Sequence, residues 1–213
     1  MPISLTVLIL ILFNIYFSFK GFNDIKFFKK FFFKINDLKK GEYYRLISSG
    51  FLHVDNQHLL FNMLTFYFFG DIVLNFLGIF WFYILYIFCL LSGNIFCFFI
   101  NYQNNNYSAV GASGAVTGIL FSAILFYPDL QLALLFFPIP MPGYFFAIIY
   151  LVYTFYGIKK QNDGIGHSAH LGGAIGGIFI SLIYEPNILM SSFNTLALMI
   201  MVIFFGIVYF KKK

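Results

Sequence analysis

The chain has 213 residues, of which 61% are hydrophobic and 10% are charged, and its mean hydropathy is +0.85. A water-soluble domain of this size carries about 25% charged residues, so the composition excludes an ordinary soluble protein and predicts a polytopic membrane protein of one domain. The net charge of +5 is small and scattered along the chain, which favours a membrane surface over nucleic acid as the partner of its cationic side chains.

Apolar runs long enough to cross a bilayer as helices follow one another along the chain. The first run resembles the core of a signal peptide, but no basic residues precede it and no cleavage site follows, so we expect an uncleaved first helix. Cys89 and Cys97 lie in one run, about 12 Å apart along a helix, which is too far for a disulfide bond. The predicted helices cover residues 2–18, 58–77, 79–100, 110–127, 142–158, 167–184 and 193–210.

Lysines and phenylalanines alternate in the connection after the first helix. This mixture is typical of a segment that lies in the membrane interface, and an exposed disordered loop is the alternative. Further along, Pro138, Pro140 and Pro142 exclude a regular helix, so we expect an irregular interfacial stretch there. The predicted organisation is a first helix (1–19), an interfacial loop called L1 (20–57), a helical core (58–185) and a C-terminal helix with a lysine tail (186–213).

Small residues surround one serine at the start of the helix predicted over 110–127. Gly111, Gly114 and Gly118 flank Ser113 and allow a neighbouring helix to approach to backbone contact. Taken alone, the segment is a helix-packing motif in which Ser113 is one more small residue.

A second helix with a glycine face is predicted over 167–184, where His170 shares a face with Gly173 and Gly177. The other helix with such a face begins at Ser113, so we expect the two helices to dock. A serine and a histidine brought together in this way can form a nucleophile–base pair, in which the histidine takes the serine proton and returns it to the leaving amine.

His58 and Asn62 lie four residues apart at the start of a helix and therefore share a face. Together with the backbone N–H of Ser113, their side chains would stabilise a developing oxyanion. For His53 and His167, a hydrogen bond to a neighbouring helix explains the residue equally well.

Other chemistries fit the residues poorly. His58 is followed by Leu-Leu-Phe-Asn and not by Glu-x-x-His, and the predicted helices hold few acidic residues, so we expect no zinc or other metal and no cofactor. Asp71 is the single carboxylate inside a predicted helix, which argues against a pair of facing aspartates. The Gly-x-Ser-x-Gly motif of soluble esterases also fails, because residue 115 is alanine.

These motifs resemble, over about residues 42–185, those of the rhomboid family of intramembrane serine proteases. The resemblance implies an all-α polytopic membrane fold with a six-helix core and, here, a seventh C-terminal helix. It implies Ser113 as the nucleophile, His170 as the base, and an oxyanion hole made by His58, Asn62 and the amide of Ser113. Helix packing or support is implied for Gly111, Gly114, Gly118, Gly173, Gly177, Arg45 and His53.

Two positions depart from the family pattern. Tyr44 precedes Arg45 where the family often has Trp-Arg; since the arginine is kept, we expect it to anchor L1. Thr117 stands where the family usually has a tyrosine or phenylalanine that packs against the catalytic histidine. We therefore expect His170 to be held less firmly, or to be held by another aromatic residue. Residues 143–157 would form the helix that the family is thought to use as a lateral gate.

The resemblance implies an endopeptidase that acts on single-span membrane proteins in the lipid bilayer, at small or helix-breaking residues in or near the membrane helix. A catalytically inactive relative that binds membrane clients for quality control is the alternative. A small-solute transporter would need charged residues at the membrane midplane, and the sequence offers little of this kind.

The orientation of the chain is subject to two opposing arguments. All 13 Lys and Arg residues fall on one side of the predicted helices, which would make that side cytoplasmic. The same side carries the mouth of the site, which bacterial rhomboids usually turn outward. Following the family, we expect a bacterial plasma membrane with the site facing outward.

Overall fold

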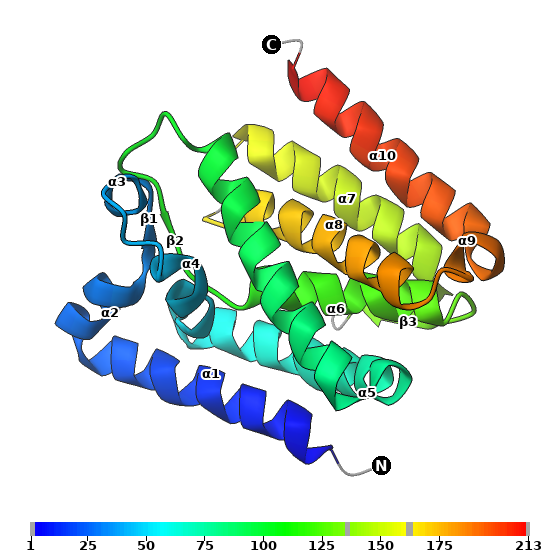
Figure 1. Cartoon of the computed structure of the whole chain (residues 1–213), viewed down its shortest axis with the longest axis horizontal. Coiled ribbons are helices and arrows are strands. Elements are labelled where there is room, and N and C mark those ends of the chain that lie inside the picture. Colours follow the sequence, from blue (N-terminus) through cyan, green and yellow to red (C-terminus); the bar gives the residue numbers. More distant parts are fainter. Residues whose placement is uncertain (1–2, 135–136, 161–163, 212–213) are drawn as a thin grey trace.

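A computed structural model describes residues 3–134, 137–160 and 164–211, which are mainly helical (Figure 1). Its helices are α1 (Leu5–Asn23), α2 (Ile25–Phe31), α3 (Ile35–Lys39), α4 (Arg45–Ser48), the 3-10 turn η1 (Ser49–Phe51), α5 (Asn56–Ile100), α6 (Ser113–Phe126), α7 (Gly143–Lys160), α8 (His167–Tyr184), α9 (Ile188–Ser191) and α10 (Phe193–Lys211). The strands are β1 (Phe33–Lys34), β2 (Ser108–Ala109), β3 (Gln131–Leu134) and β4 (Phe137–Pro142).

α5 is two helices joined by a sharp turn. The turn is at Gly78, whose φ of 72° and ψ of 168° are a backbone conformation that glycine adopts readily and other residues avoid. The predicted break between residues 77 and 79 is therefore confirmed. At the start of α5, the side chain of Asp55 accepts a hydrogen bond of 2.7 Å from the backbone N–H of His58 and caps the helix.

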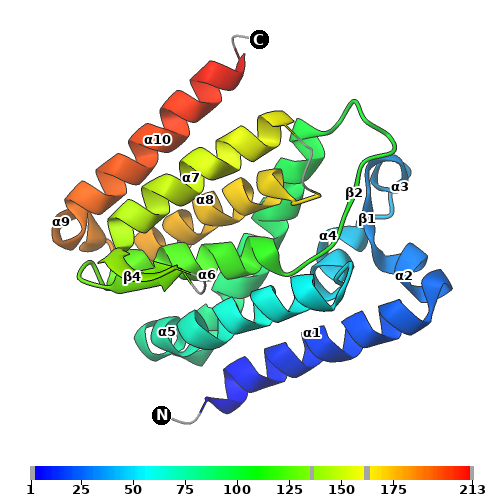
Figure 2. The same ribbon diagram turned by 180° about the vertical axis from the view of Figure 1, so that it is seen from behind.

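The centre of the molecule is the packing of α5, α6 and α8 (Figures 1 and 2). α6 is enclosed by its neighbours, since every residue from Gly114 to Phe126 is buried. Serine hydroxyls connect the three helices: Ser92 donates to the carbonyl of Gly172 (2.7 Å) and Ser122 to that of Gly177 (3.3 Å). Around this centre, α1 packs on α5, α7 packs on α8, and α10 packs on α7.

L1 is folded, which excludes the alternative of a disordered loop. It contains the short helices α2, α3 and α4. β1, between α2 and α3, pairs antiparallel with β2 in the register Phe33↔Ala109 and Lys34↔Ser108. The backbone N–H of Gly111 also donates to the carbonyl of Ser49 (3.0 Å). L1 is thus attached to the segment that leads into α6.

The proline-rich stretch after α6 differs from the irregular chain that we expected. β3 and β4 form an antiparallel hairpin, with Gln131 opposite Pro142 and Leu132 opposite Met141. Proline lacks a backbone N–H, but a two-stranded hairpin has outer edges where no N–H is needed, so the prolines are compatible with a strand. Residues 135–136 of this stretch, 161–163 of the loop before α8, and the last two lysines lie outside the described residues.

By length and composition, α1 and α5 are long and apolar enough to cross a membrane, and α6 and residues Phe193–Tyr209 of α10 are shorter apolar helices. Many large apolar side chains on the outside of the molecule are exposed, as expected where the solvent is lipid. The helix content agrees with a polytopic helical protein.

Candidate active site

The glycine faces of α6 and α8 meet at backbone contact, as predicted. A Cβ atom added to Gly173 would meet the backbone of Gly114, lying 2.9 Å from its Cα. A Cβ atom on Gly177 would likewise lie 2.8 Å from the Cα of Gly118. Neither contact leaves room for a methyl group, so the helix–helix distance depends on these glycines.

This docking brings Ser113 and His170 to the same end of two adjacent helices. Ser113 is the first residue of α6, and His170 lies in the first turn of α8. Gly173, one turn after His170, contacts Gly114, the residue after Ser113, so the two half-buried side chains lie at a similar level. Among the described residues, the Ser113 hydroxyl forms no hydrogen bond. Catalytic hydrogen bonds are often long or absent before substrate binds and shorten in the complex.

α5 forms a third wall of the helix pair, which the sequence did not reveal. A Cβ atom on Gly93 of α5 would lie 2.7 Å from the carbonyl oxygen of Ala169 and 3.4 Å from the Cα of Gly114. A Cβ atom on Gly118 would meet the sulfur of Cys89, which is buried and free, as is Cys97. The three helices are therefore held at close distance around the start of α6.

His58 lies against the loop that precedes Ser113. A Cβ atom on Gly111 would lie 2.7 Å from Cε1 and 2.9 Å from Nε2 of the His58 ring, and Gly111 has a φ of 129°. Among the described residues, Nδ1 of His58 is buried and makes no hydrogen bond. The Nδ2 atom of Asn62 donates to the backbone carbonyl of His58 (2.9 Å), so one of its two N–H groups is used within α5.

His53 links this loop to α1 through hydrogen bonds. Its Nε2 accepts a long bond of 3.5 Å from the N–H of Ala112, and its Nδ1 lies 2.8 Å from the hydroxyl oxygen of Ser18, which itself donates to the carbonyl of Phe51. These contacts assign the proton to Nδ1. Burial, with a smaller contribution from His58, lowers the pKa of His53 to about 3, so the ring is neutral at neutral pH. These contacts suit a structural role better than that of a base.

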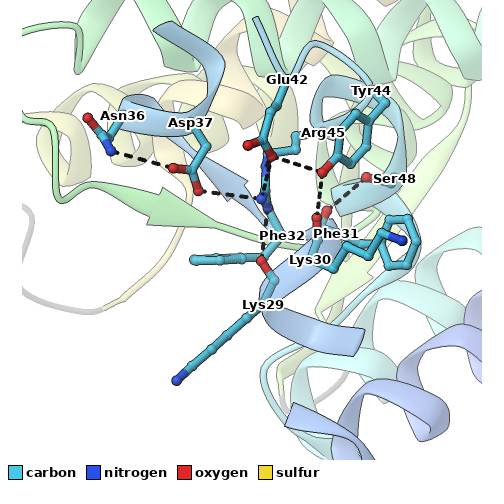
Figure 3. A network of polar contacts seen from close by, with 10 residues as sticks. All are labelled: Lys29, Lys30, Phe31, Phe32, Asn36, Asp37, Glu42, Tyr44, Arg45 and Ser48. Atoms are coloured by element: carbon cyan, nitrogen blue, oxygen red, sulfur yellow. Dashed lines mark hydrogen bonds and ion pairs between the residues drawn. The ribbon is translucent and has the colours of Figure 1, made fainter. Parts of the chain in front are cut away.

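Arg45 organises L1 from a buried position (Figure 3). Its guanidinium donates to the carbonyls of Lys29 (3.0 Å), in the last turn of α2, and Phe32 (2.8 Å), the residue that follows α2. It also forms ion pairs with Glu42 (2.7 Å) and Asp37 (3.4 Å). The fork of donors suits several acceptors at once, and it fixes the turn between α2 and β1.

Tyr150 of α7 is a site residue that the sequence did not single out. Its ring stacks on the ring of His170, with centroids 6.0 Å apart and planes at 28°. Its hydroxyl shares a hydrogen bond of 2.9 Å with the hydroxyl of Thr117. An aromatic residue thus contacts His170 although position 117 is threonine. No sequence signal identifies it, because the apolar run over 142–158 contains several tyrosines.

A pocket of about 420 Å³ lies between L1, the segment that leads into α6, and the facing ends of α7 and α8. His58 lines this pocket, whereas Ser113, His170 and Tyr150 do not. Among the described residues, no group of three or more His, Cys, Asp and Glu side chains is placed to hold a metal ion. The pocket lining includes Phe28, Phe32, His58, Tyr107, Gly157 and His167.

Comparison with known proteins adds to this geometry. The family model of the rhomboid domain matches residues 40–187. The chain is 30% identical over 177 residues to RHOMBOID-like protein 12, mitochondrial, of Arabidopsis thaliana, a match that covers 76% of this chain and 52% of that protein. It is 31% identical over 142 residues to Rhomboid protease GluP of Bacillus subtilis, covering 67% of this chain and 26% of that protein. A third relative, Rhomboid protein 1, mitochondrial, of Saccharomyces cerevisiae, is 28% identical over 138 residues, covering 62% and 39% of the two chains.

The chain therefore spans about half, or less, of the length of these relatives. Two of the three are named as mitochondrial proteins. The comparisons thus do not support the bacterial plasma membrane that we expected.

Proposed function

Because the chain belongs to the rhomboid family, and is accordingly an integral membrane protein, we propose that it is an intramembrane serine endopeptidase. Its substrates would be single-span membrane proteins, cut in or near the membrane helix. The observation that carries the proposal is the contact between the glycine faces of α6 and α8, which brings Ser113 and His170 to one end of the helix pair.

In this mechanism His170 takes the proton of Ser113 as the serine oxygen attacks the scissile carbonyl. His170 then gives the proton to the leaving amine, and water hydrolyses the acyl-enzyme by the same route in reverse order. No acidic third member is required. The glycine contacts support this role, because they leave little freedom for the two helices to separate.

The oxyanion would be stabilised by the backbone N–H of Ser113, the ring of His58 and the remaining N–H of Asn62. The N–H of Ser113 belongs to the first turn of α6, where backbone donors have no partner within the helix. His58 contacts Gly111 just before the nucleophile. This close approach supports the assignment, because it holds the His58 ring next to the nucleophile. Loss of one donor from an oxyanion hole typically lowers kcat by about 100-fold or more.

For the membrane arrangement we propose that α1, the two halves of α5, α6, α7 and α8 form a six-helix core, to which α10 adds an accessory seventh helix. Substrate would come from the bilayer past α7, and water from the side of the pocket, where L1 and the ends of α7 and α8 meet. An intact helix hides its carbonyls, so cleavage sites with small or helix-breaking residues are favoured.

Cleavage of a single-span reporter by the purified protein in detergent tests the proposal. Wild type and the matched control Ser191→Ala, an exposed serine of α9, should cut the reporter, whereas Ser113→Ala and His170→Ala should not. Equal cutting by wild type and Ser113→Ala would remove Ser113 from the mechanism.

A second function, binding of membrane clients without cleavage, is also compatible with two details: the Ser113 hydroxyl has no hydrogen bond among the described residues, and one Asn62 N–H is used within its own helix. This function predicts that wild type and Ser113→Ala bind the reporter equally and that neither cuts it.

A further inference from the structure

The ring of Tyr150 is enclosed by aromatic residues of three helices. Besides His170 of α8, it contacts Phe121 of α6 at 5.9 Å and Phe146 of its own helix at 6.1 Å between ring centroids. Its hydroxyl is held by Thr117 of α6. The ring therefore contacts three other rings and is hydrogen-bonded through its hydroxyl, which restricts its rotation.

The position of this ring matters because it connects the base to the helix of the nucleophile. Thr117 lies one helical turn after Ser113, so the path His170–Tyr150–Thr117 runs from α8 to α6 through a residue of α7. A stacked aromatic ring restricts the rotation of an imidazole and stabilises the imidazolium that forms when the base takes a proton.

A second set of contacts seats α7 on the same turn of α8. Tyr153 meets the ring of His167 edge-on at 5.0 Å, and His167 lies 6.0 Å from His170. A Cβ atom on Gly157 would collide with the His167 ring. The end of α7 thus approaches the first turn of α8 closely, because Gly157 has no side chain and leaves space for the His167 ring.

We propose that Tyr150 is a positioning residue for His170, so that the base is competent when α7 is seated against α6 and α8 and loses its orientation when α7 moves away. This inference rests on the proposed function. It makes α7 more than a barrier to substrate, because the same movement that opens a lateral path would remove the ring that orients the base.

The test compares variants at residue 150 by two measurements: the rate at which a fluorophosphonate probe labels Ser113, in which the serine oxygen bonds to phosphorus and fluoride leaves, and kcat and KM for the reporter. Tyr150→Leu should lower the labelling rate and kcat by roughly 5- to 10-fold, with KM little changed, because one ring contact with the base is lost. Tyr150→Phe keeps the ring and should stay within about 3-fold of wild type. The matched control is Tyr144→Leu, an exposed tyrosine of the same helix, which should behave as wild type.

Two further variants separate positioning from a loss of folding. In Thr117→Phe combined with Tyr150→Ala, the aromatic ring is moved from α7 to α6 with similar total volume, and it should recover part of the labelling lost in Tyr150→Ala alone. Gly157→Ala displaces α7 without altering Tyr150 and should lower labelling in the same direction as Tyr150→Leu. Melting temperatures in detergent verify that each variant is folded.

The outcomes are distinct. If wild type and Tyr150→Leu are labelled equally fast, the positioning role is overturned and the protease proposal stands. A fall in kcat for Tyr150→Phe as large as for Leu would overturn the role of the ring. Wild type that is labelled but cuts no reporter would overturn the proposed activity on such substrates, and the positioning role would still be decided by labelling. If folded wild type is not labelled, both the protease proposal and the positioning role are overturned, because the protein then has no activated serine.

Discussion

Arg45 shows how much of L1 depends on one side chain. Its buried guanidinium bonds two carbonyls and two carboxylates of the same loop. Glu42 also accepts a hydrogen bond from the hydroxyl of Tyr44; this bond first, and then the bond from Arg45, lowers the pKa of the Glu42 carboxyl. Burial, followed by the bond to Glu42, raises the pKa of Tyr44. The loop is therefore held by charge-assisted hydrogen bonds as well as by packing.

Replacing Arg45 should destabilise the protein strongly. Arg45→Ala removes two hydrogen bonds to backbone carbonyls and the ion pairs with Glu42 and Asp37, and we expect a loss of about 3 kcal/mol in the free energy of unfolding. Arg45→Lys should recover only part of it, because an ammonium group cannot reproduce the planar fork. Thermal unfolding in detergent measures the loss, with the exposed Lys26→Ala as the matched control. Equal melting temperatures for Arg45→Ala and the control would contradict the anchoring role.

His53 should make the stability of the protein dependent on pH. Its folded pKa of about 3 lies below the ordinary value of 6.5, so the unfolded chain binds more protons over this interval and stability falls as the pH drops below 6.5. At pH 5 the loss relative to neutral pH is about 2 kcal/mol, from the 1.5 units between 6.5 and 5.

The comparison of wild type with His53→Gln isolates this effect. Between pH 6.5 and 5, where carboxylates titrate little, the unfolding free energy of wild type should decline more steeply than that of the variant, which lacks the contribution of His53. Parallel curves for the two proteins over this range would contradict a buried neutral His53.

At the scale of secondary-structure elements, the contact between α6 and α8 is made of backbone on both sides. Side chains can change rotamer to accept an added methyl group, but backbone cannot, so this contact is intolerant of any larger residue. The cost of substitution should therefore be greater here than in a core of ordinary side chains.

Gly173→Ala should lower the unfolding free energy by about 3 kcal/mol, at the upper end of the range for overpacking, because its methyl group would meet the backbone of Gly114. Gly166→Ala is the matched control: the nearest atom to its added Cβ is the Cβ of Ala169 at 3.9 Å, an ordinary contact. Thermal unfolding of the two variants should differ widely, and similar values would mean that α6 and α8 are less closely docked.

The main helices were predictable because each lies in a long apolar run of the sequence. The helix predicted over 167–184 is α8, and the break at Gly78 follows from a glycine between two apolar runs. The docking of α6 on α8 was predictable from glycine spacing. The hairpin of β3 and β4 was not, because apolar residues between prolines carry no helix or strand period.

The contacts that complete the site are harder to foresee. The stacking of Tyr150 on His170 joins side chains from two helices, and sequence periodicity gives the face of one helix but not its rotation against another. Gly93 was missed for the same reason, since its partners lie on α6 and α8. Roles for Ser113, His170, His58 and Asn62 stay predictions until the variants are measured.

At the scale of the whole molecule, α10 packs mainly on α7 and α9, at the edge of the bundle away from α1 (Figures 1 and 2). Gly206 of α10 accepts the ring of Phe155 from α7, since a Cβ atom there would collide with that ring. α10 therefore bears on the packing of α7 and leaves the centre formed by α5, α6 and α8 intact.

A chain that ends after Ser192 should remain active. The central helices keep their contacts, so labelling of Ser113 and cleavage of the reporter should persist, while the melting temperature falls because one side of α7 loses its neighbour. Loss of labelling in a truncated chain that still unfolds cooperatively would show that α10 belongs to the catalytic unit and is not accessory.

The pairing of β1 with β2 has a consequence for biogenesis. Its two strands are separated in the sequence by both halves of α5, so during synthesis L1 leaves the ribosome long before its partner strand exists. The edge of β1 in this lysine-rich loop therefore stays unpaired until α5 and then β2 have been synthesised. Its last backbone partners lie at residues 108–111, just ahead of Ser113. L1 therefore becomes fully paired immediately before α6, the helix that begins at Ser113, is synthesised.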